Sequence, residues 1–283
     1  MYNFPISYNE PLFRPPSEGR SLIIQITLGC SWNKCSFCEM YSSKQFKARK
    51  EEAVFADIEA FLPHAQSIRK VFLADGDAVV LSTDKLLRII SKLKETFPRL
   101  QRISSYASPR NLNAKSLSEL KELKDAGLSL LYVGIESGDN QVLKQINKGE
   151  TFSSIVEGLN KSKQAGLNSS VMIINGVGGQ ELWQQHALNS ALILNETQPK
   201  YASTLVLTAY KGMDYLKSRI NGNFTELDTL GLVKEFKMFI ENTNLNETIF
   251  RSDHASNFLV FKGVLGRDKD AFLEKIDNVL TGV

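Results

Sequence analysis

The chain has 283 residues, of which 42% are apolar and 23% are charged. This is the composition of an ordinary globular protein with one large domain or two small ones. Its 34 basic and 31 acidic residues nearly balance, which argues against a dedicated nucleic-acid-binding protein. No apolar run is long enough to span a membrane, and residues 1–20 lack the pattern of a secretion signal. We therefore expect a cytoplasmic protein whose thiols stay reduced.

Strand and helix patterns alternate along the chain from residue 21 onward. Short runs rich in apolar residues predict strands at 21–27, 70–75, 102–108, 128–137, 167–176 and 202–207. Apolar residues at helical spacing predict helices at 51–62, 82–97, 116–127, 152–166, 180–196, 233–242 and 268–280. In the second of these helices, the spacing predicts a buried face made of Leu86, Leu87, Ile90, Leu93 and Phe97.

Gly127 and Gly166 each end a predicted helix and lead directly into an apolar strand, in the similar sequences KDAGLSLLYVGI and KQAGLNSSVMII. A glycine at this place is typical of the connection between a helix and the next strand of a βα repeat. The pattern gives about six βα units, and such alternation predicts a parallel sheet. In parallel α/β sheets the functional site lies at the C-terminal ends of the strands.

All three cysteines of the chain, Cys30, Cys35 and Cys38, lie in the stretch TLGCSWNKCSFCEMY, directly after the first predicted strand. Clustered thiols in a reduced compartment indicate metal or redox chemistry. A structural zinc site needs four ligands, and the only histidines, His64, His186 and His254, are distant in sequence. A 4Fe–4S cluster on three thiolates instead leaves one iron open for a small-molecule ligand, which matches the number of cysteines.

These cysteines, with Phe37 just before the last of them, resemble the cluster motif of the radical S-adenosylmethionine (radical SAM) superfamily. The usual motif has three residues between its first two cysteines, whereas this chain has four, residues 31–34. A second segment, LLYVGIESGDNQVLKQINKGET, is similar to the fourth-strand region of one branch of that superfamily. The branch holds methylthiotransferases, the elongator catalytic subunit and coproporphyrinogen dehydrogenase. The similarity covers roughly residues 20–200.

The resemblance implies that Cys30, Cys35 and Cys38 hold a 4Fe–4S cluster and that S-adenosylmethionine (SAM) binds its open iron. In the segment LADGDA, Gly76 and Asp77 occupy the place of the Gly-Gly-Glu segment that binds the methionyl amino group of SAM in the family. Asp75 stands there in place of the first glycine, and the acid of the segment is shorter by one carbon.

Other positions that match the family are implied to contact the cofactor. Glu136 corresponds to an acid that lies near the ribose and amino-acid part of SAM, while Asn175 and Gly176 lie in MIINGVGG, which looks like the end of the fifth strand. The chemistry of the side chains agrees, since carboxylates suit the ammonium and hydroxyls of SAM, glycine allows close approach and Phe37 can lie against adenine. A different role for Glu136 is to cap a helix that starts near Asp139.

The segment FRSDHASNFLVFKG places several polar residues before an apolar run near the C-terminus. One interpretation is a capped turn with a hydrogen-bonded histidine. The other is a substrate-facing cluster at the barrel mouth, in which His254 and Asp253 act as catalytic residues. For Trp32, within the cysteine segment, both a packing role and a role as a lid over the cluster stay open.

We therefore predict an α/β fold, namely a partial (β/α)6 TIM-like barrel with a short C-terminal α/β extension. Residues 1–20 are expected to form an N-terminal extension, residues 21–210 the radical SAM core barrel, and residues 211–283 an extension that completes the barrel mouth.

The resemblance implies an oxygen-sensitive enzyme that cleaves SAM reductively to a 5′-deoxyadenosyl radical, which abstracts hydrogen from a small-molecule substrate. The implied partner is a flavodoxin- or ferredoxin-like electron donor; no nucleic acid or membrane is expected as a partner. Two alternatives stay open. The first is a non-enzymic Cys3His zinc or cofactor-carrier protein on a barrel scaffold, and the second is a radical SAM enzyme that modifies RNA or protein.

Overall fold

A computed structural model describes residues 5–282 and divides them into two compact units. The first unit comprises residues 5–33, 38–133 and 161–168, and the second comprises residues 34–37, 134–160 and 169–282. No helix within these described residues is both long and apolar enough to cross a membrane.

Parallel strands form the sheet of the first unit. Their order is β1-β4-β5-β6, and each neighbouring pair is parallel. Four of the five residues of β4 are buried, as expected for a parallel strand that is covered on both faces. These strands are β1 (Leu22–Gln25), β4 (Lys70–Ala74), β5 (Arg102–Tyr106) and β6 (Leu128–Glu136), while a separate antiparallel pair is formed by β2 (Thr27–Leu28) and β3 (Lys47–Ala48).

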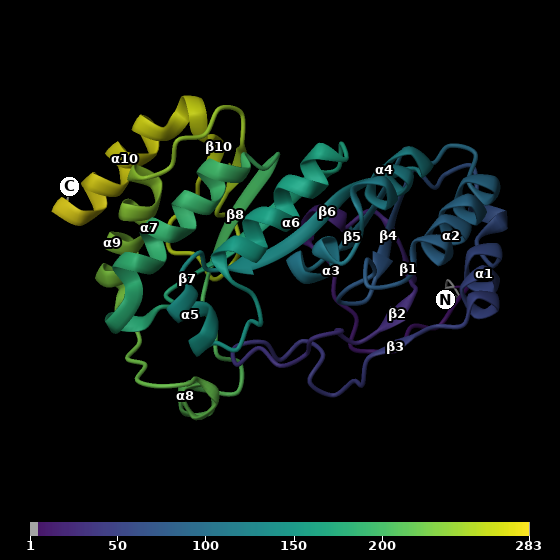
Figure 1. The fold of residues 1–283 in the computed structure, drawn as a ribbon. Coiled ribbons are helices and arrows are strands. Elements are labelled where there is room, and N and C mark those ends of the chain that lie inside the picture. The colour runs from purple at the N-terminus through teal and green to yellow at the C-terminus, as the bar shows by residue number, and fades with distance from the viewer. Residues whose placement is uncertain (1–4, 283) are drawn as a thin grey trace. The chain divides into compact units, whose positions relative to one another are not determined.

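Helices α1, α2 and α4 of the first unit lie side by side (Figure 1). A capping box of Ser116 and Glu119 starts α4, and Gly127, with a φ of 130°, ends it as predicted. The buried face of α2 contains Ile89, whereas Leu87 of the predicted face is only half-buried. The helices are α1 (Glu51–Glu59), α2 (Thr83–Thr96), α3 (Pro109–Asn113) and α4 (Leu117–Ala126), with 3-10 turns at Pro16–Glu18 and Leu62–His64.

The second unit has its own strands, in the order β7-β8-β9-β10. β7, β8 and β9 are parallel, and β10 pairs antiparallel with β9. The chain passes between the units within β6, which ends in the second unit, and within α6, which begins there. The strands are β7 (Asn168–Asn175), β8 (Tyr201–Val206), β9 (Ile249–Arg251) and β10 (Lys262–Val264).

In the second unit, α7, α9 and α10 pack side by side (Figure 1). An aromatic cluster joins α9 and α10 to the last strands, with ring centroids between 4.8 and 6.4 Å apart: Phe236, Phe239, Phe250, Phe261 and Phe272. The helices are α5 (Asn140–Gln145), α6 (Phe152–Gln164), α7 (Gly179–Thr197), α8 (Met213–Arg219), α9 (Thr229–Glu241) and α10 (Leu265–Thr281).

The predicted alternation is present, because β1, β4, β5, β6, β7 and β8 are each followed by a helix before the next of these strands. Sequence patterns missed α3, α5, α8, β3 and β9, which are short. A helix of two turns or fewer, or a strand of two or three residues, is too short to produce a periodic signal. The predicted division into a core over 21–210 with extensions on either side stays a prediction.

Candidate functional site

The three cysteines are divided between the two units. Cys30 and Cys38 belong to the first unit and Cys35 to the second, and each is half-buried. Cys30 follows Gly29, whose φ of +72° is a backbone conformation that favours glycine. Within residues 5–282, no group of three or more His, Cys, Asp or Glu side chains is arranged to hold a metal ion. Assignment of a cluster to these thiols therefore rests on the motif and on the family.

The peptide between the last two cysteines is anchored in the second unit. Arg219 Nη2 donates to the carbonyl of Cys35 at 2.9 Å, and Ser36 Oγ donates to the carbonyl of Arg219 at 2.7 Å. The N–H of Ser36 donates to the carbonyl of Ile146 at 2.8 Å. Phe37 packs against an apolar cluster of Val142, Ile146, Ile174, Val177 and Leu182. Phe37, the ring that we expect to face adenine, therefore lies among apolar side chains at the ends of β7 and α5.

In the first unit, Gly76 lies against the start of the cysteine segment. A Cβ atom at Gly76 would stand 3.1 Å from the Cβ of Cys30 and 2.8 Å from Cε2 of Tyr41. Contacts this short leave no room for a side chain, so the position requires glycine. The packing against Tyr41 and Cys30 explains the glycine, and the predicted contact of Gly76 with SAM stays a prediction.

Asp77 is buried and carries an unpartnered oxygen. Its Oδ2 accepts hydrogen bonds from Ser31 Oγ at 2.9 Å, from Ser108 Oγ at 3.0 Å and from the side-chain amide of Asn111. Its Oδ1 has no hydrogen-bond partner among the residues described. Burial raises the pKa of Asp77 to about 6, although the hydrogen bonds from Ser31, Asn111 and Ser108 act in the opposite direction. A buried carboxylate oxygen without a donor is suited to a cationic or N–H donor from a ligand.

Trp32 lies under an arginine. The guanidinium carbon of Arg110, at the start of α3, stands 4.0 Å from the centroid of the Trp32 ring. Such a cation–π contact fixes the indole in the first unit. Of the two roles considered for Trp32, this contact supports packing.

Glu136, at the end of β6, does not cap a helix. Asp139 caps α5, since its Oδ1 accepts from the N–H groups of Gln141 and Val142. Glu136 Oε1 instead accepts from Lys148 Nζ at 2.9 Å, while Oε2 is buried and has no partner within the described chain. With a φ of +67°, Glu136 also adopts a left-handed conformation that is rare for a residue with a side chain. Such outliers cluster at functional sites.

Gly176, just after β7, is held by a buried acid that sequence analysis did not single out. The N–H of Gly176, which has a φ of +84°, donates to Glu235 Oε1 at 2.6 Å. Glu235 is 1% exposed, and burial raises its pKa to about 8. His186 Nε2 lies 3.8 Å from the same oxygen, and His186 Nδ1 is 2.8 Å from Ser137 Oγ. The available signal was Glu235 itself, which stands at helical spacing among the apolar residues of α9.

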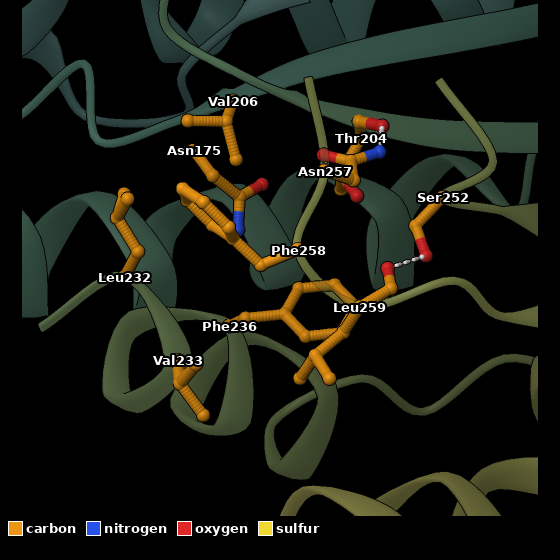
Figure 2. Close-up of a pocket in the computed structure, with 10 residues that line it drawn as sticks. All are labelled: Asn175, Thr204, Val206, Leu232, Val233, Phe236, Ser252, Asn257, Phe258 and Leu259. Carbon is orange, nitrogen blue, oxygen red and sulfur yellow. Dashed lines mark hydrogen bonds between the residues drawn. The ribbon is translucent and has the colours of Figure 1, made fainter. Parts of the chain in front are cut away.

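A small hollow, partly open to solvent, lies beside Asn175 in the second unit. Figure 2 shows the ring of Phe258 beside Asn175 in this view and the ring of Phe236 beside Leu259. The predicted substrate segment lines this hollow, with Asn257 Nδ2 donating to the carbonyl of Thr204 at 2.8 Å. The full lining is Asn175, Thr204, Val206, Leu232, Val233, Phe236, Ser252, Asn257, Phe258 and Leu259.

Asp253 and His254 are not among the residues that line the hollow. Asp253 accepts from Lys262 Nζ at 3.0 Å, and this bond lowers the pKa of Asp253. His254 is exposed, and its Nδ1 lies 2.8 Å from Ser256 Oγ. These are contacts of a hydrogen-bonded turn, and the catalytic role of the two residues stays a prediction.

Comparison with known proteins identifies the family of the chain. Residues 24–190 match the family model of the radical SAM superfamily, which is more than half of the chain. The chain therefore belongs to the radical SAM superfamily. Members of this superfamily use a 4Fe–4S cluster and SAM, and the relatives found include proteins of the predicted branch.

Two curated relatives show how similar the chain is to known proteins and how much of each protein the similarity covers. The heme chaperone HemW of Bacillus subtilis is 22% identical over 179 residues, which are 62% of this chain and 46% of HemW. A probable GTP 3′,8-cyclase of Sulfolobus acidocaldarius is 31% identical over 154 residues, 53% of this chain and 45% of the relative. The chain thus spans about half the length of these curated relatives.

Solved structures with a similar fold include coproporphyrinogen III oxidase (HemN) from Escherichia coli, with a TM-score of 0.62 and 18% identity. That match covers 78% of this chain and 51% of the other. Methylornithine synthase (PylB) matches with a TM-score of 0.53 and 15% identity, over 92% of this chain and 81% of its own. The likeness is one of fold, and it confirms the predicted α/β class of the partial barrel.

Proposed function

We infer that the protein is a radical SAM enzyme in which Cys30, Cys35 and Cys38 hold a 4Fe–4S cluster. The observation that carries this inference is the cysteine triplet after the first strand of a chain that belongs to the superfamily. When bound, the reduced cluster supplies one electron that splits SAM into methionine and a 5′-deoxyadenosyl radical, which abstracts hydrogen from the substrate. A flavodoxin- or ferredoxin-like protein would supply the electron.

Two buried acids support the binding of SAM. Asp77 Oδ1 and Glu136 Oε2 are both buried, and neither has a partner in residues 5–282. Leaving such atoms unpaired costs free energy, which a ligand that brings donors recovers. We assign the ammonium group of SAM to Asp77 and a donor from its ribose or amino-acid part to Glu136. Gly76 and Gly176 would allow the close approach of SAM to the backbone, Phe37 would face the adenine ring, and Asn175 would add an amide.

The substrate class that we propose is a small organic molecule. Asn175, Phe236 and Phe258 beside the hollow would suit an apolar group with one hydrogen-bonding atom. A second candidate function is a cofactor carrier, favoured by HemW, a relative named as a heme chaperone. Heme titration separates the two: a carrier would bind heme stoichiometrically, whereas an enzyme of the first kind would form 5′-deoxyadenosine without binding heme.

Anaerobic reconstitution with iron and sulfide tests the first function. We expect about four irons and four sulfides per chain, an EPR signal after reduction that changes on addition of SAM, and 5′-deoxyadenosine in the product mixture. A chain that took up a single zinc ion and formed no 5′-deoxyadenosine would be a zinc protein and not a radical SAM enzyme.

Asp77→Asn is expected to weaken SAM binding about 10- to 100-fold, because the negative charge that would face the SAM ammonium is replaced by a neutral amide. Iron content should stay at the wild-type level, since Asp77 is not a proposed cluster ligand. Equilibrium binding of SAM to the reconstituted oxidised protein measures the effect. The control is Asp84→Asn, which changes an exposed acid in the first turn of α2. Equal affinities in Asp77→Asn and wild type would remove Asp77 from the SAM site.

A further inference from the structure

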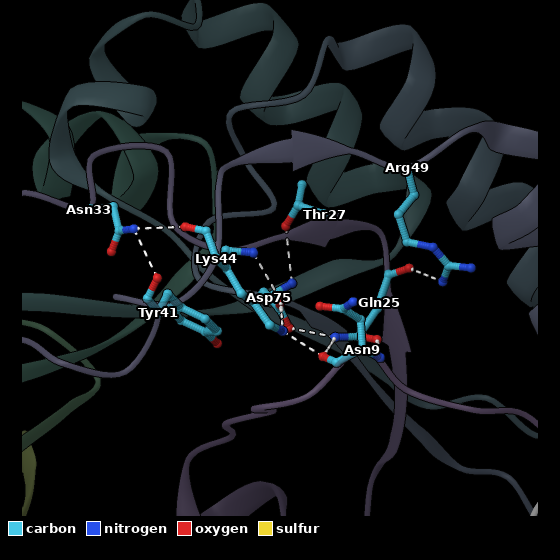
Figure 3. A network of polar contacts seen from close by, with 9 residues as sticks. Asn9, Gln25, Thr27, Asn33, Tyr41, Lys44, Arg49 and Asp75 are labelled. Carbon is cyan, nitrogen blue, oxygen red and sulfur yellow. Dashed lines mark hydrogen bonds and ion pairs between the residues drawn. The ribbon is translucent and has the colours of Figure 1, made fainter.

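Both ends of the cysteine loop, defined here as residues 29–44, are bound to one buried carboxylate in the first unit (Figure 3). Asp75 Oδ2 accepts from the N–H of Gly29 at 3.0 Å and from Lys44 Nζ at 2.9 Å. The side chain of Asp75 is fully buried and that of Lys44 is 5% exposed. Gly29 directly precedes Cys30, and Lys44 closes the loop after Cys38, so a single oxygen ties the start of the loop to its end.

Further hydrogen bonds join the same two ends. Asn33 Nδ2 donates to the carbonyls of Tyr41 and Lys44, at 2.9 and 3.1 Å (Figure 3). The N–H of Gly76 donates to the carbonyl of Gly29 at 3.1 Å. The residue after Asp75 therefore binds the loop as well, which connects the end of β4 to the residue before Cys30.

The remaining groups of the ion pair are satisfied by neighbours in the same unit. Asp75 Oδ1 accepts from Gln25 Nε2 at 2.9 Å, and Lys44 Nζ also donates to the carbonyl of Asn9 at 2.5 Å. A buried pair of this kind contributes little net stability compared with apolar packing, but the loss of one partner leaves a buried charge unpaired. The pair is thus better suited to fixing one geometry than to stabilising the fold.

We propose that Asp75 and Lys44 are positioning residues for the iron–sulfur cluster, and that their ion pair sets the path of the cysteine loop. Two departures from the family pattern meet at this pair: one extra residue between Cys30 and Cys35, and Asp75 in place of a glycine. The charged side chain at position 75 binds the ends of the lengthened loop, which a glycine cannot do. This inference rests on the proposed function, because it assumes that the loop holds a cluster.

The test compares reconstituted Lys44→Met, Asp75→Asn and Lys44→Arg with the wild type. Lys44→Met and Asp75→Asn should release iron to a chelator at least about tenfold faster, because each leaves one partner of a buried pair uncompensated. Both should also change the g values of the reduced cluster, a property of the folded holoprotein that a general loss of stability would not alter. Lys44→Arg keeps the positive charge beside Asp75 and should release iron more slowly than Lys44→Met.

Asp57→Asn is the control, because it removes the acid of another ion pair in the same unit, the pair of Asp57 with Arg49 at 2.5 Å. We expect its iron release and EPR signal to match the wild type. If Lys44→Met and Asp75→Asn also behave like Asp57→Asn while the wild type holds its cluster, the positioning role is wrong and the proposed function stands. If the wild type itself takes up no iron and sulfide, the proposed function fails and the positioning role fails with it.

Discussion

Cys38→Ala is expected to lose the cluster and all formation of 5′-deoxyadenosine. The chain contains only three cysteines, so no other thiol can replace the missing ligand. With two thiolates left, iron and sulfide should fall below about a tenth of the wild-type content after anaerobic reconstitution. Iron and sulfide analysis and quantification of 5′-deoxyadenosine by chromatography measure the two losses.

The control for this substitution is Ser43→Ala, which alters an exposed residue of the same loop. It should retain wild-type iron and wild-type SAM cleavage. The circular dichroism of Cys38→Ala should match the wild type, because Cys38 is half-buried and its truncation removes one sulfur atom from a loop. A Cys38→Ala protein that still formed 5′-deoxyadenosine would show that these cysteines do not support the reaction.

The fold was predictable because its signals are local. Gly127 and Gly166 have φ values of 130° and 82°, and each ends a helix before a strand, as the sequence predicted. The buried side of α2 follows the 3.6-residue period. It contains Ile89 and not the predicted Leu87, so the buried face is turned slightly about the helix axis from its predicted position. Elements without such a period, such as β9 and α8, become visible only when their tertiary partners are known.

The candidate site was predictable in part, for the same reason. Asp77 and Glu136 lie at strand ends inside recognisable segments, and their burial gives the prediction a physical basis. The pairing of Lys44 with Asp75 joins residues 31 positions apart, and that of Gly176 with Glu235 joins residues 59 positions apart. No period or spacing encodes such pairs, since they depend on how the chain folds back on itself.

Glu235→Gln is expected to make the protein more stable than the wild type at high pH. Burial raises the pKa of Glu235 to about 8 from an ordinary value of 4.5, so the folded protein keeps a proton that the unfolded chain releases. The stability that comes from the protonated carboxyl is complete below pH 4.5 and is lost as the pH rises through about 8. Glutamine stays neutral and can still accept the hydrogen bond from the N–H of Gly176.

The difference in unfolding free energy between Glu235→Gln and the wild type should therefore be small at pH 5 and grow by up to about 5 kcal/mol by pH 9. Guanidinium unfolding at pH 5, 7 and 9, under anaerobic conditions, measures it. Glu241→Gln, at the exposed end of the same helix, should follow the wild-type pH dependence.

His186 lies beside Glu235, but its titration changes the unfolding free energy with pH in the opposite direction. Burial lowers the pKa of His186 to about 4 from 6.5, so its stabilising contribution is present above pH 6.5 and is lost as the pH falls through about 4. That trend is opposite in sign to the trend from Glu235 and is shared by the wild type and Glu235→Gln, so it cancels in their difference. If the two proteins lose stability in parallel between pH 5 and 9, Glu235 is ionised in the folded state, and the carboxyl that holds Gly176 is then a charged group.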